Sequence, residues 1–260
     1  MAKHKRVWNK SVHEKYLREG RGCGSGIDYL PWIRVQDFSS QGIVSRVKGR
    51  TTGRVHHLFS NNELAYFYML DWSESVTDIR EQFPLSDLQS ALYAANGAGV
   101  RYPKDNISGY PYVMTCDFMI TTTSGLKART IKMASELSNQ RVLEKLEIER
   151  RYWIELGVDW KIVTENEISY RKARNIEWLY MAEGFTLNNT LKEAANELRG
   201  MAVNNGYTVT EITEMIDKYY SLSPGTGLQL FKYLVLNRLL ILDLNEPIDL
   251  NRKVLALVAA

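Results

Sequence analysis

The chain has 260 residues, of which 45% are hydrophobic and 24% are charged, a balance that supports a folded protein and excludes general disorder. No run of about 18 apolar residues occurs, and no apolar stretch follows the basic N-terminus, so we expect neither a membrane span nor a secretory signal, and a cytoplasmic location. Cys23 and Cys116 lie far apart in a pattern without metal-binding spacing, so we expect two free thiols.

The net charge of +3 is unevenly distributed along the chain. Residues 1–55 contain twelve Lys and Arg against four Asp and Glu, a net charge of +8, whereas the remaining residues carry a net charge of −5. This asymmetry is typical of a phosphate-binding arm or face, although basic leaders are also found as plain solvated segments. The glycines within residues 20–26 lack the Gly-Lys-Ser or Gly-Lys-Thr ending of a nucleotide-binding loop and favour a turn.

The first part of the chain predicts an α/β (α+β) unit, a mixed sheet with flanking helices. A capping-box spacing between Ser60 and Glu63 begins a helix. Further elements are expected as strands at 76–83, 113–120, 126–133 and 160–164, and as helices at 85–95 and 135–156. In the longest helix these side chains recur at helical intervals: Leu143, Leu146, Glu147, Arg150, Trp153 and Ile154. The strand, helix, strand order around it favours a crossover in a mixed sheet.

From residue 170 the pattern changes to helices, which are expected at 171–182, 190–203, 210–222 and 227–237. Residues 239–244 and 248–250 flank a turn signal and favour a small hairpin. Helices closed by such a hairpin are compatible with a winged-helix module. We therefore expect two domains, 1–168 with a basic N-terminal arm and a small winged-helix-like domain at 169–260.

Two neighbouring strands of the predicted sheet bring opposite charges together. With a two-residue loop of Ser124 and Gly125, Asp117 lies directly opposite Lys132 across a hairpin. Strict alternation points Asp117 away from an apolar face formed by Cys116, Phe118 and Ile120.

Such a pair has two interpretations. It is an ordinary cross-strand ion pair, or it belongs to an active site, which needs a second acid. Glu63 is the candidate for that acid, although its capping box with Ser60 is already a sufficient structural role. The residue pattern alone leaves both interpretations open.

Glu63 on an early helix, Asp117 on a strand and Lys132 on the next strand resemble the core of a PD-(D/E)xK nuclease. The wider sequence closely resembles the TnsA family, transposon endonucleases that work beside a TnsB transposase and a TnsC ATPase. The similarity is carried by residues 20–22, 28–32, 52–58, 78–85, 143–147, 150–153 and 175–180. Towards the C-terminus it is weaker and rests on the helix-rich pattern, which fits the family's winged-helix domain.

The resemblance implies a restriction-endonuclease-like domain in which Glu63, Asp117 and Lys132 are catalytic. It implies a metal-dependent endonuclease subunit of a heteromeric transposase that hydrolyses the non-transferred strand at the 5′ side of transposon ends. The expected cofactor is one or two Mg²⁺ ions, replaceable by Mn²⁺, held by Glu63, Asp117, Thr130 and the Ile131 carbonyl. The expected partners are transposon-end DNA, a TnsB-like transposase and a TnsC-like ATPase.

One position departs from the family pattern, which commonly has Gln or an acid two residues before the lysine. Thr130 stands there, and its short hydroxyl is a poorer metal ligand than an amide or carboxylate oxygen. Three explanations remain open: a water extends its reach, the Ile131 carbonyl and the other acids suffice, or the activity is reduced.

Basic residues upstream of Glu63 are the candidate DNA contacts, namely Lys48, Arg50, Arg54 and His57. His56 and His57 are adjacent and face opposite ways on a strand, so they cannot grip one metal together, and DNA backbone contact or packing is expected of them.

Two other functions are consistent with parts of the pattern. The protein could serve chiefly as an adaptor, with a weakened nuclease and a C-terminal part that binds the transposase and the ATPase. A plain winged-helix DNA-binding regulator is disfavoured, because the basic charge is at the other end and the helix at 210–222 carries only Lys218 as a basic residue.

Overall fold

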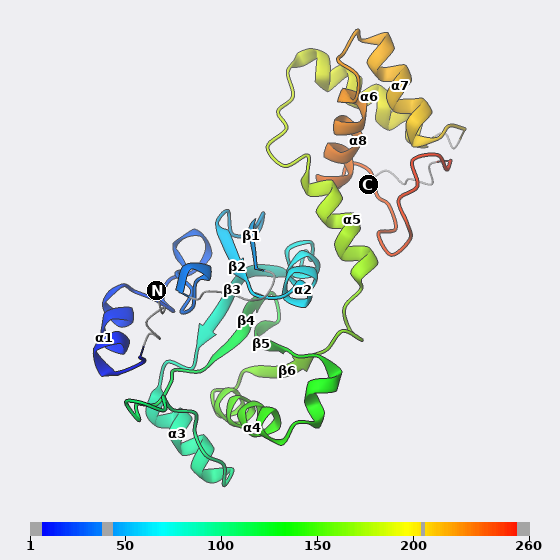
Figure 1. Ribbon diagram of the computed structural model, residues 1–260. Coiled ribbons are helices and arrows are strands. Elements are labelled where there is room, and N and C mark those ends of the chain that lie inside the picture. Colours follow the sequence, from blue (N-terminus) through cyan, green and yellow to red (C-terminus); the bar gives the residue numbers. More distant parts are fainter. Residues whose placement is uncertain (1–6, 38–43, 204–205, 254–260) are drawn as a thin grey trace, which may run out of the picture. The chain divides into compact units, whose positions relative to one another are not determined.

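A computed structural model describes residues 7–37, 44–203 and 206–253. The chain divides into two compact units between Ile168 and Ser169 (Figure 1). The first unit contains α1 (Lys10–Arg18), η1 (Gly26–Asp28), η2 (Val35–Asp37), β1 (Ser45–Lys48), β2 (Val55–Leu58), α2 (Asn61–Asp71), β3 (Val76–Pro84), α3 (Leu88–Gly97), β4 (Thr115–Thr122), β5 (Gly125–Ile131), η3 (Ala134–Ser138), α4 (Gln140–Glu155) and β6 (Asp159–Val163). The second contains α5 (Tyr170–Tyr180), α6 (Asn189–Val203), α7 (Val209–Tyr219) and α8 (Thr226–Leu236). None of the helices in the described ranges is long and apolar enough to cross a membrane.

A four-stranded mixed sheet in the order β3-β4-β5-β6 forms the centre of the first unit (Figure 1). β3, β4 and β5 are antiparallel neighbours, whereas β6 runs parallel to β5. A parallel pair needs a crossover connection, and α4 supplies it. β1 and β2 form a separate antiparallel pair. The predicted mixed α/β class is confirmed.

Side-chain caps explain where the helices of this unit begin. The hydroxyl of Ser60 accepts the backbone N–H of Glu63 at the start of α2, as the capping box predicts. Asn139 caps α4 in the same way, with its side chain accepting two backbone N–H groups. The predicted helix at 135–156 is therefore divided, because the Asn139 cap starts α4 after the short 3₁₀ turn η3.

The face of α4 that packs inward differs from the predicted one. Its buried residues are Leu146, Ile148, Glu149, Tyr152 and Trp153, whereas Leu143 and Ile154 are exposed. Glu147 belongs to the outer face, where Arg150 and Arg151 donate to its carboxylate at 2.7 and 2.6 Å. The predicted set mixed these two faces.

The predicted strict alternation along β4 is wrong near the start of the strand. Cys116 packs in one cluster with Met119, whereas Phe118 contacts Tyr66 of α2 with ring centroids 5.8 Å apart. Residues expected to share a face thus contact different layers. The irregularity lies beside Gln82 of the neighbouring strand β3, whose backbone has a φ of +49°.

The register of the β4–β5 hairpin also differs from the prediction. Thr122 pairs with Gly125, so residues 123–124 form the loop, and Asp117 does not lie opposite Lys132, which follows the end of β5. The Thr122 hydroxyl donates to the Gly125 carbonyl at 2.9 Å and closes the turn, and Gly125 adopts a φ of +120° that a glycine tolerates. The observed pairing differs from the predicted one by two residues. A shift by an even number does not by itself move a side chain to the other face of the sheet.

The second unit is helical, as predicted. Its core is formed by Ala194, Leu198, Ile212, Ile216, Leu230, Phe231 and Leu234. The predicted hairpin at 239–250 is wrong: these described residues form no β-strand, and the backbone N–H groups of Asn245 and Glu246 bond back to Asp243 in a turn at 244–246. Within the described part of this unit, the wing of a winged helix is therefore not built from paired strands.

Candidate active site

Three acidic and basic residues from separate elements meet where β4 begins and β5 ends, at the same end of the two central strands. Glu63 comes from α2, Asp117 from β4, and Lys132 follows the last residue of β5. Burial and repulsion from Asp117 raise the pKa of Glu63 to about 7, against hydrogen bonds from its neighbours and the attraction of Lys132. The three predicted catalytic side chains are therefore close enough to act on one another electrostatically.

Glu63 has both roles that its position in the sequence suggests. Its carboxylate accepts the backbone N–H of Phe59 and the hydroxyl of Ser60, each at 3.0 Å, so it reaches back to the start of α2, although the N–H of Phe59 takes the place that the N–H of Ser60 has in a capping box. The side chain is only 7% exposed and still experiences the charge of Asp117. The cap thus fixes the carboxylate at the site instead of drawing it away.

Asp117 is held by both of its carboxylate oxygens. Oδ2 accepts the backbone N–H of Ile131 at 2.6 Å, and Oδ1 accepts the side-chain amide of Gln82 at 3.3 Å. Burial raises the pKa of Asp117, although Lys132 and the Ile131 N–H act in the opposite direction. The strand on each side of β4 therefore contributes one contact that orients this carboxylate.

Lys132 is half-buried, and its ammonium donates to the carbonyl of Ile131 at 2.9 Å. In the part of the chain that the structure describes, Lys132 forms no direct ion pair with Asp117. The two residues are therefore not an ordinary cross-strand ion pair. A lysine held by one backbone carbonyl can turn towards an incoming anion at little cost.

Glu149, an acid that the sequence analysis missed, lies beside this group. It is 5% exposed on the inner face of α4, and its carboxylate accepts the hydroxyl of Thr130 at 2.5 Å. Its pKa is raised to about 7. Burial is the main cause and the charge of Asp117 acts in the same direction, whereas the hydrogen bond from Thr130 acts against them. Because Thr130 is buried and commits its hydroxyl to Glu149, we do not keep it as a direct metal ligand.

The remaining oxygen donors suit a hard divalent cation. Among the described residues, no group of three or more His, Cys, Asp and Glu side chains is arranged to hold a metal ion. The residues that could hold such an ion are Glu63 and Asp117, through their carboxylates, and Ile131, through its carbonyl, and waters or phosphate oxygens would complete the coordination. Two buried carboxylates whose pKa values are both raised form a pair that a divalent cation would stabilise.

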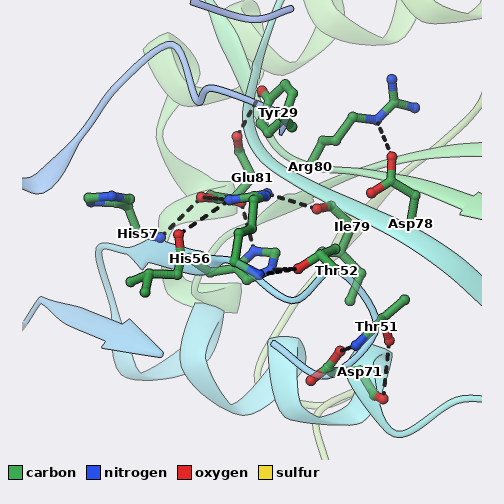
Figure 2. A network of polar contacts seen from close by, with 12 residues as sticks. Tyr29, Thr51, Thr52, His56, His57, Asp71, Asp78, Ile79, Arg80 and Glu81 are labelled. Carbon is green, nitrogen blue, oxygen red and sulfur yellow. Dashed lines mark hydrogen bonds and ion pairs between the residues drawn. The ribbon is translucent and has the colours of Figure 1, made fainter. Parts of the chain in front are cut away.

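Arg54, a predicted DNA contact, belongs to a buried network around Glu81. Figure 2 shows Glu81 and its partner His56 in this network. The Arg54 guanidinium forms an ion pair with Glu81 and donates to the carbonyl of Ile79 at 2.9 Å. His56 lies 2.8 Å from Glu81 on one side and 2.7 Å from the Thr52 hydroxyl on the other. Since Arg54 is only 8% exposed, it does not suit the predicted phosphate contact, and it links β2 to β3 instead.

The other predicted DNA contacts lie nearer the surface. Lys48 is exposed on β1 and Arg50 is exposed just after it. Arg46 points the same way as Lys48 on β1 and pairs in register with His57 of β2. Burial lowers the pKa of the half-buried His57, the charge of Glu81 opposes this, and the charges of Arg34, Arg46 and Arg54 lower the pKa again, so His57 lies beside both kinds of charge.

The chain is similar to known proteins over most of its length. Residues 73–165 match the family described as TnsA-like endonuclease N terminal, and residues 167–244 match the family described as TnsA endonuclease C terminal. The Transposon Tn7 transposition protein TnsA of Escherichia coli is 36% identical over 241 residues, which cover 91% of this chain and 87% of that protein. The chain therefore belongs to the TnsA family of transposition endonucleases.

Proposed function

We propose that the protein is the Mg²⁺-dependent endonuclease subunit of a heteromeric transposase, and that it hydrolyses the non-transferred strand at the 5′ side of transposon ends. The observation that carries this proposal is the Asp117 carboxylate, fixed by the Ile131 N–H beside the buried Glu63 and the ammonium of Lys132. A substrate of transposon DNA implies action in the bacterial cytoplasm, at the nucleoid.

Each residue would have a distinct task in cleavage. Asp117 and Glu63 would bind Mg²⁺ in their ionised forms, with Mn²⁺ as a substitute. The bound ion would lower the pKa of the attacking water and offset charge on the leaving oxygen. Lys132 would leave the Ile131 carbonyl and donate to a phosphate oxygen, because a positive group aimed at the developing charge stabilises the transition state.

DNA would reach this site over the exposed basic residues of the β1 strand and the loop after it, Arg46, Lys48 and Arg50. Phosphate contacts of this kind position DNA without reading its sequence. Recognition of the transposon end would therefore depend on the proposed partners, a TnsB-like transposase and a TnsC-like ATPase. We expect little cleavage by the isolated protein for the same reason.

The test is 5′ nicking of a labelled transposon end in the reconstituted system. Asp117→Ala should lower the nicking rate by more than about 100-fold, because it removes a metal ligand. Asp159→Ala is the matched control: this carboxylate lies on β6 of the same sheet and pairs with Arg129, at 2.7 Å. A folded Asp117→Ala protein that nicks DNA at the parent rate would exclude the proposed site.

A second candidate function is an adaptor with a weakened nuclease, and one observation favours it. Thr130 stands where a metal ligand is common, and its hydroxyl is engaged by Glu149. Lys132→Ala separates the two functions when nicking and assembly with the partners are measured independently. The nuclease proposal predicts lost nicking with intact assembly, whereas unchanged nicking and transposition favour the adaptor.

A further inference from the structure

Gln82 has a backbone conformation that is unusual for its place in the fold. Among the described residues, Gln82, Ser221 and Arg238 are the non-glycine residues with a positive φ. Ser221 and Arg238 follow the last turns of α7 and α8, where a left-handed residue commonly ends a helix. Gln82, with a φ of +49°, lies inside the strand β3, where such a conformation is strained for a residue with a Cβ atom.

This conformation redirects the chain on both sides of Gln82. Glu81 enters the buried network with Arg54 and His56 (Figure 2). Phe83 instead packs against Trp153 of α4, with ring centroids 5.9 Å apart. Residues two apart in a regular strand share a face, so the left-handed residue between them allows β3 to serve both layers.

The side chain of Gln82 contacts Asp117 on the neighbouring strand, between the paired residues Glu81–Phe118 and Phe83–Cys116. It is 6% exposed, its amide N–H group donates to Asp117 Oδ1 at 3.3 Å, and its carbonyl oxygen accepts the hydroxyl of Thr115 at 3.2 Å. A hydroxyl donor at the carbonyl end leaves the NH₂ end to face the carboxylate. With Oδ2 held by the Ile131 N–H, both oxygens of Asp117 are restrained.

We propose that Gln82 is a positioning residue, which fixes the Asp117 carboxylate in the orientation needed to hold a divalent cation, and that its strained backbone is retained for this purpose. The inference rests on the proposed nuclease function. An uncharged amide is suited to the task, because it restrains the carboxylate without neutralising the charge that the cation uses. Partners of this kind typically change metal affinity or activity by about 10- to 100-fold.

Two substitutions separate the amide from the backbone. Gln82→Met keeps the length and the backbone strain but removes the donor, whereas Gln82→Gly removes the side chain and relieves the strain. Both should weaken Mn²⁺ binding to the full-length protein by about 10- to 100-fold, measured by electron paramagnetic resonance without DNA. The Mg²⁺ concentration for half-maximal nicking should rise by a similar factor, while DNA affinity without metal stays at the parent value.

Thermal stability and a control decide between positioning and folding. Gln82→Gly should melt no lower than Gln82→Met and still be equally impaired in Mn²⁺ binding. Ser221→Gly, which relieves a left-handed residue after α7, should bind Mn²⁺ as the parent does. If Gln82→Gly binds Mn²⁺ and nicks DNA like the parent, while Asp117→Ala is inactive, the role of Gln82 is refuted and the nuclease site stands. If Asp117→Ala also nicks normally, the proposed function fails first.

Discussion

Glu149 places a carboxyl group on the apolar face of α4, where its partner is the Thr130 hydroxyl. Burial raises its pKa to about 7, whereas an unfolded chain would titrate it near the ordinary value of 4.5. Between these two values the folded protein binds a proton that the unfolded chain does not bind. Stability must therefore fall as the pH rises from about 4.5 through 7.

Glu149→Gln should remove this part of the pH dependence. The amide oxygen can still accept the Thr130 hydroxyl, but no charge is buried at high pH. We expect the variant to gain up to about 3 kcal/mol over the parent at pH 8 and almost nothing at pH 4.5. Urea unfolding at the two pH values measures the difference. An equal change at both pH values would show that Glu149 titrates normally in the folded protein.

The sequence could indicate Glu63, Asp117 and Lys132 because the family resemblance gave them roles. Spacing alone brought Asp117 and Lys132 to neighbouring strands, with a pairing that the register does not show. It did not indicate Glu149, because the predicted inner face of 135–156 mixed residues of the inner and outer faces and left Glu149 out. A signal was present: Glu149 lies three residues after Leu146 and three before Tyr152, on the stripe that proved to be buried. An acid on an apolar stripe deserves a functional interpretation.

At the scale of elements, β2 and β3 are joined by buried charges that looked like a DNA-binding surface in the sequence. Burial acts to raise the pKa of Glu81, but hydrogen bonds from Arg54 and His56 outweigh it and lower the pKa to about 2. The sequence could not distinguish Arg54 from the exposed Lys48, because the distinction depends on Glu81, which comes from a distant strand.

Arg54→Met should therefore affect stability, whereas Lys48→Met should affect DNA binding. Arg54→Met leaves the buried Glu81 without its main counter-charge and should lower the free energy of unfolding by about 3 to 5 kcal/mol. Lys48→Met should change stability by less than about 0.5 kcal/mol but reduce the salt dependence of DNA binding by about one unit of slope. Stability is measured by urea unfolding and the slope by DNA titrations at several salt concentrations. If Lys48→Met does not change the salt dependence of DNA binding, Lys48 does not contact DNA and is an ordinary solvated surface residue.

The glycines at 20–26 form a turn, as the sequence favoured, and two of them offer a matched comparison. Gly22 has a φ of +76°, and a Cβ atom there would lie 2.4 Å from the ring of Pro84 at the end of β3. Gly26 has a φ of +53° with no atom nearby.

Gly26→Ala should destabilise the protein by about 1 to 2 kcal/mol through the left-handed backbone alone. Gly22→Ala should add about 1 to 3 kcal/mol because of the clash with Pro84. Equal melting temperatures for the two variants would contradict the close packing of this turn against β3.

Helix starts were predictable because capping side chains act locally, as at Ser60. The hairpin register was harder to predict from the sequence. Gly125 looks like a loop residue, but it belongs to β5, where it pairs with Thr122 and accepts the Thr122 hydroxyl. A turn replaces the hairpin predicted at 239–250, because Asp243 accepts the backbone N–H groups of Asn245 and Glu246. Short polar side chains decided these cases, and hydrophobic periodicity does not report them.

At the scale of the whole molecule, each unit has its own buried core, with a mixed sheet before residue 169 and packed helices after it. Fragments 1–168 and 169–260 should therefore fold separately and melt cooperatively. The first fragment should retain Mn²⁺ binding within about threefold of the full chain, because Glu63, Asp117 and Lys132 all belong to it. Calorimetry and Mn²⁺ titration test this, and a fragment that melts without a cooperative transition would refute the independence of the units.

The positive charge of residues 1–55 is partly used inside the fold. The pair of Arg21 with Asp37 is already counted in the net charge of +8 of residues 1–55, but Arg54 forms an ion pair with Glu81, which lies outside that segment. One of these eight positive charges is thus neutralised within the fold. The salt slope of DNA binding should be smaller than the charge count suggests.

The proposed metal site is tested most directly by a crystal structure of the protein with transposon-end DNA and Mn²⁺, with the metal located by anomalous scattering. We predict a peak bonded to the carboxylates of Asp117 and Glu63 at about 2.0 to 2.3 Å, with Lys132 turned to a phosphate oxygen. A strong peak elsewhere on cleaved DNA, with Asp117 and Glu63 bound to protein groups alone, would contradict it.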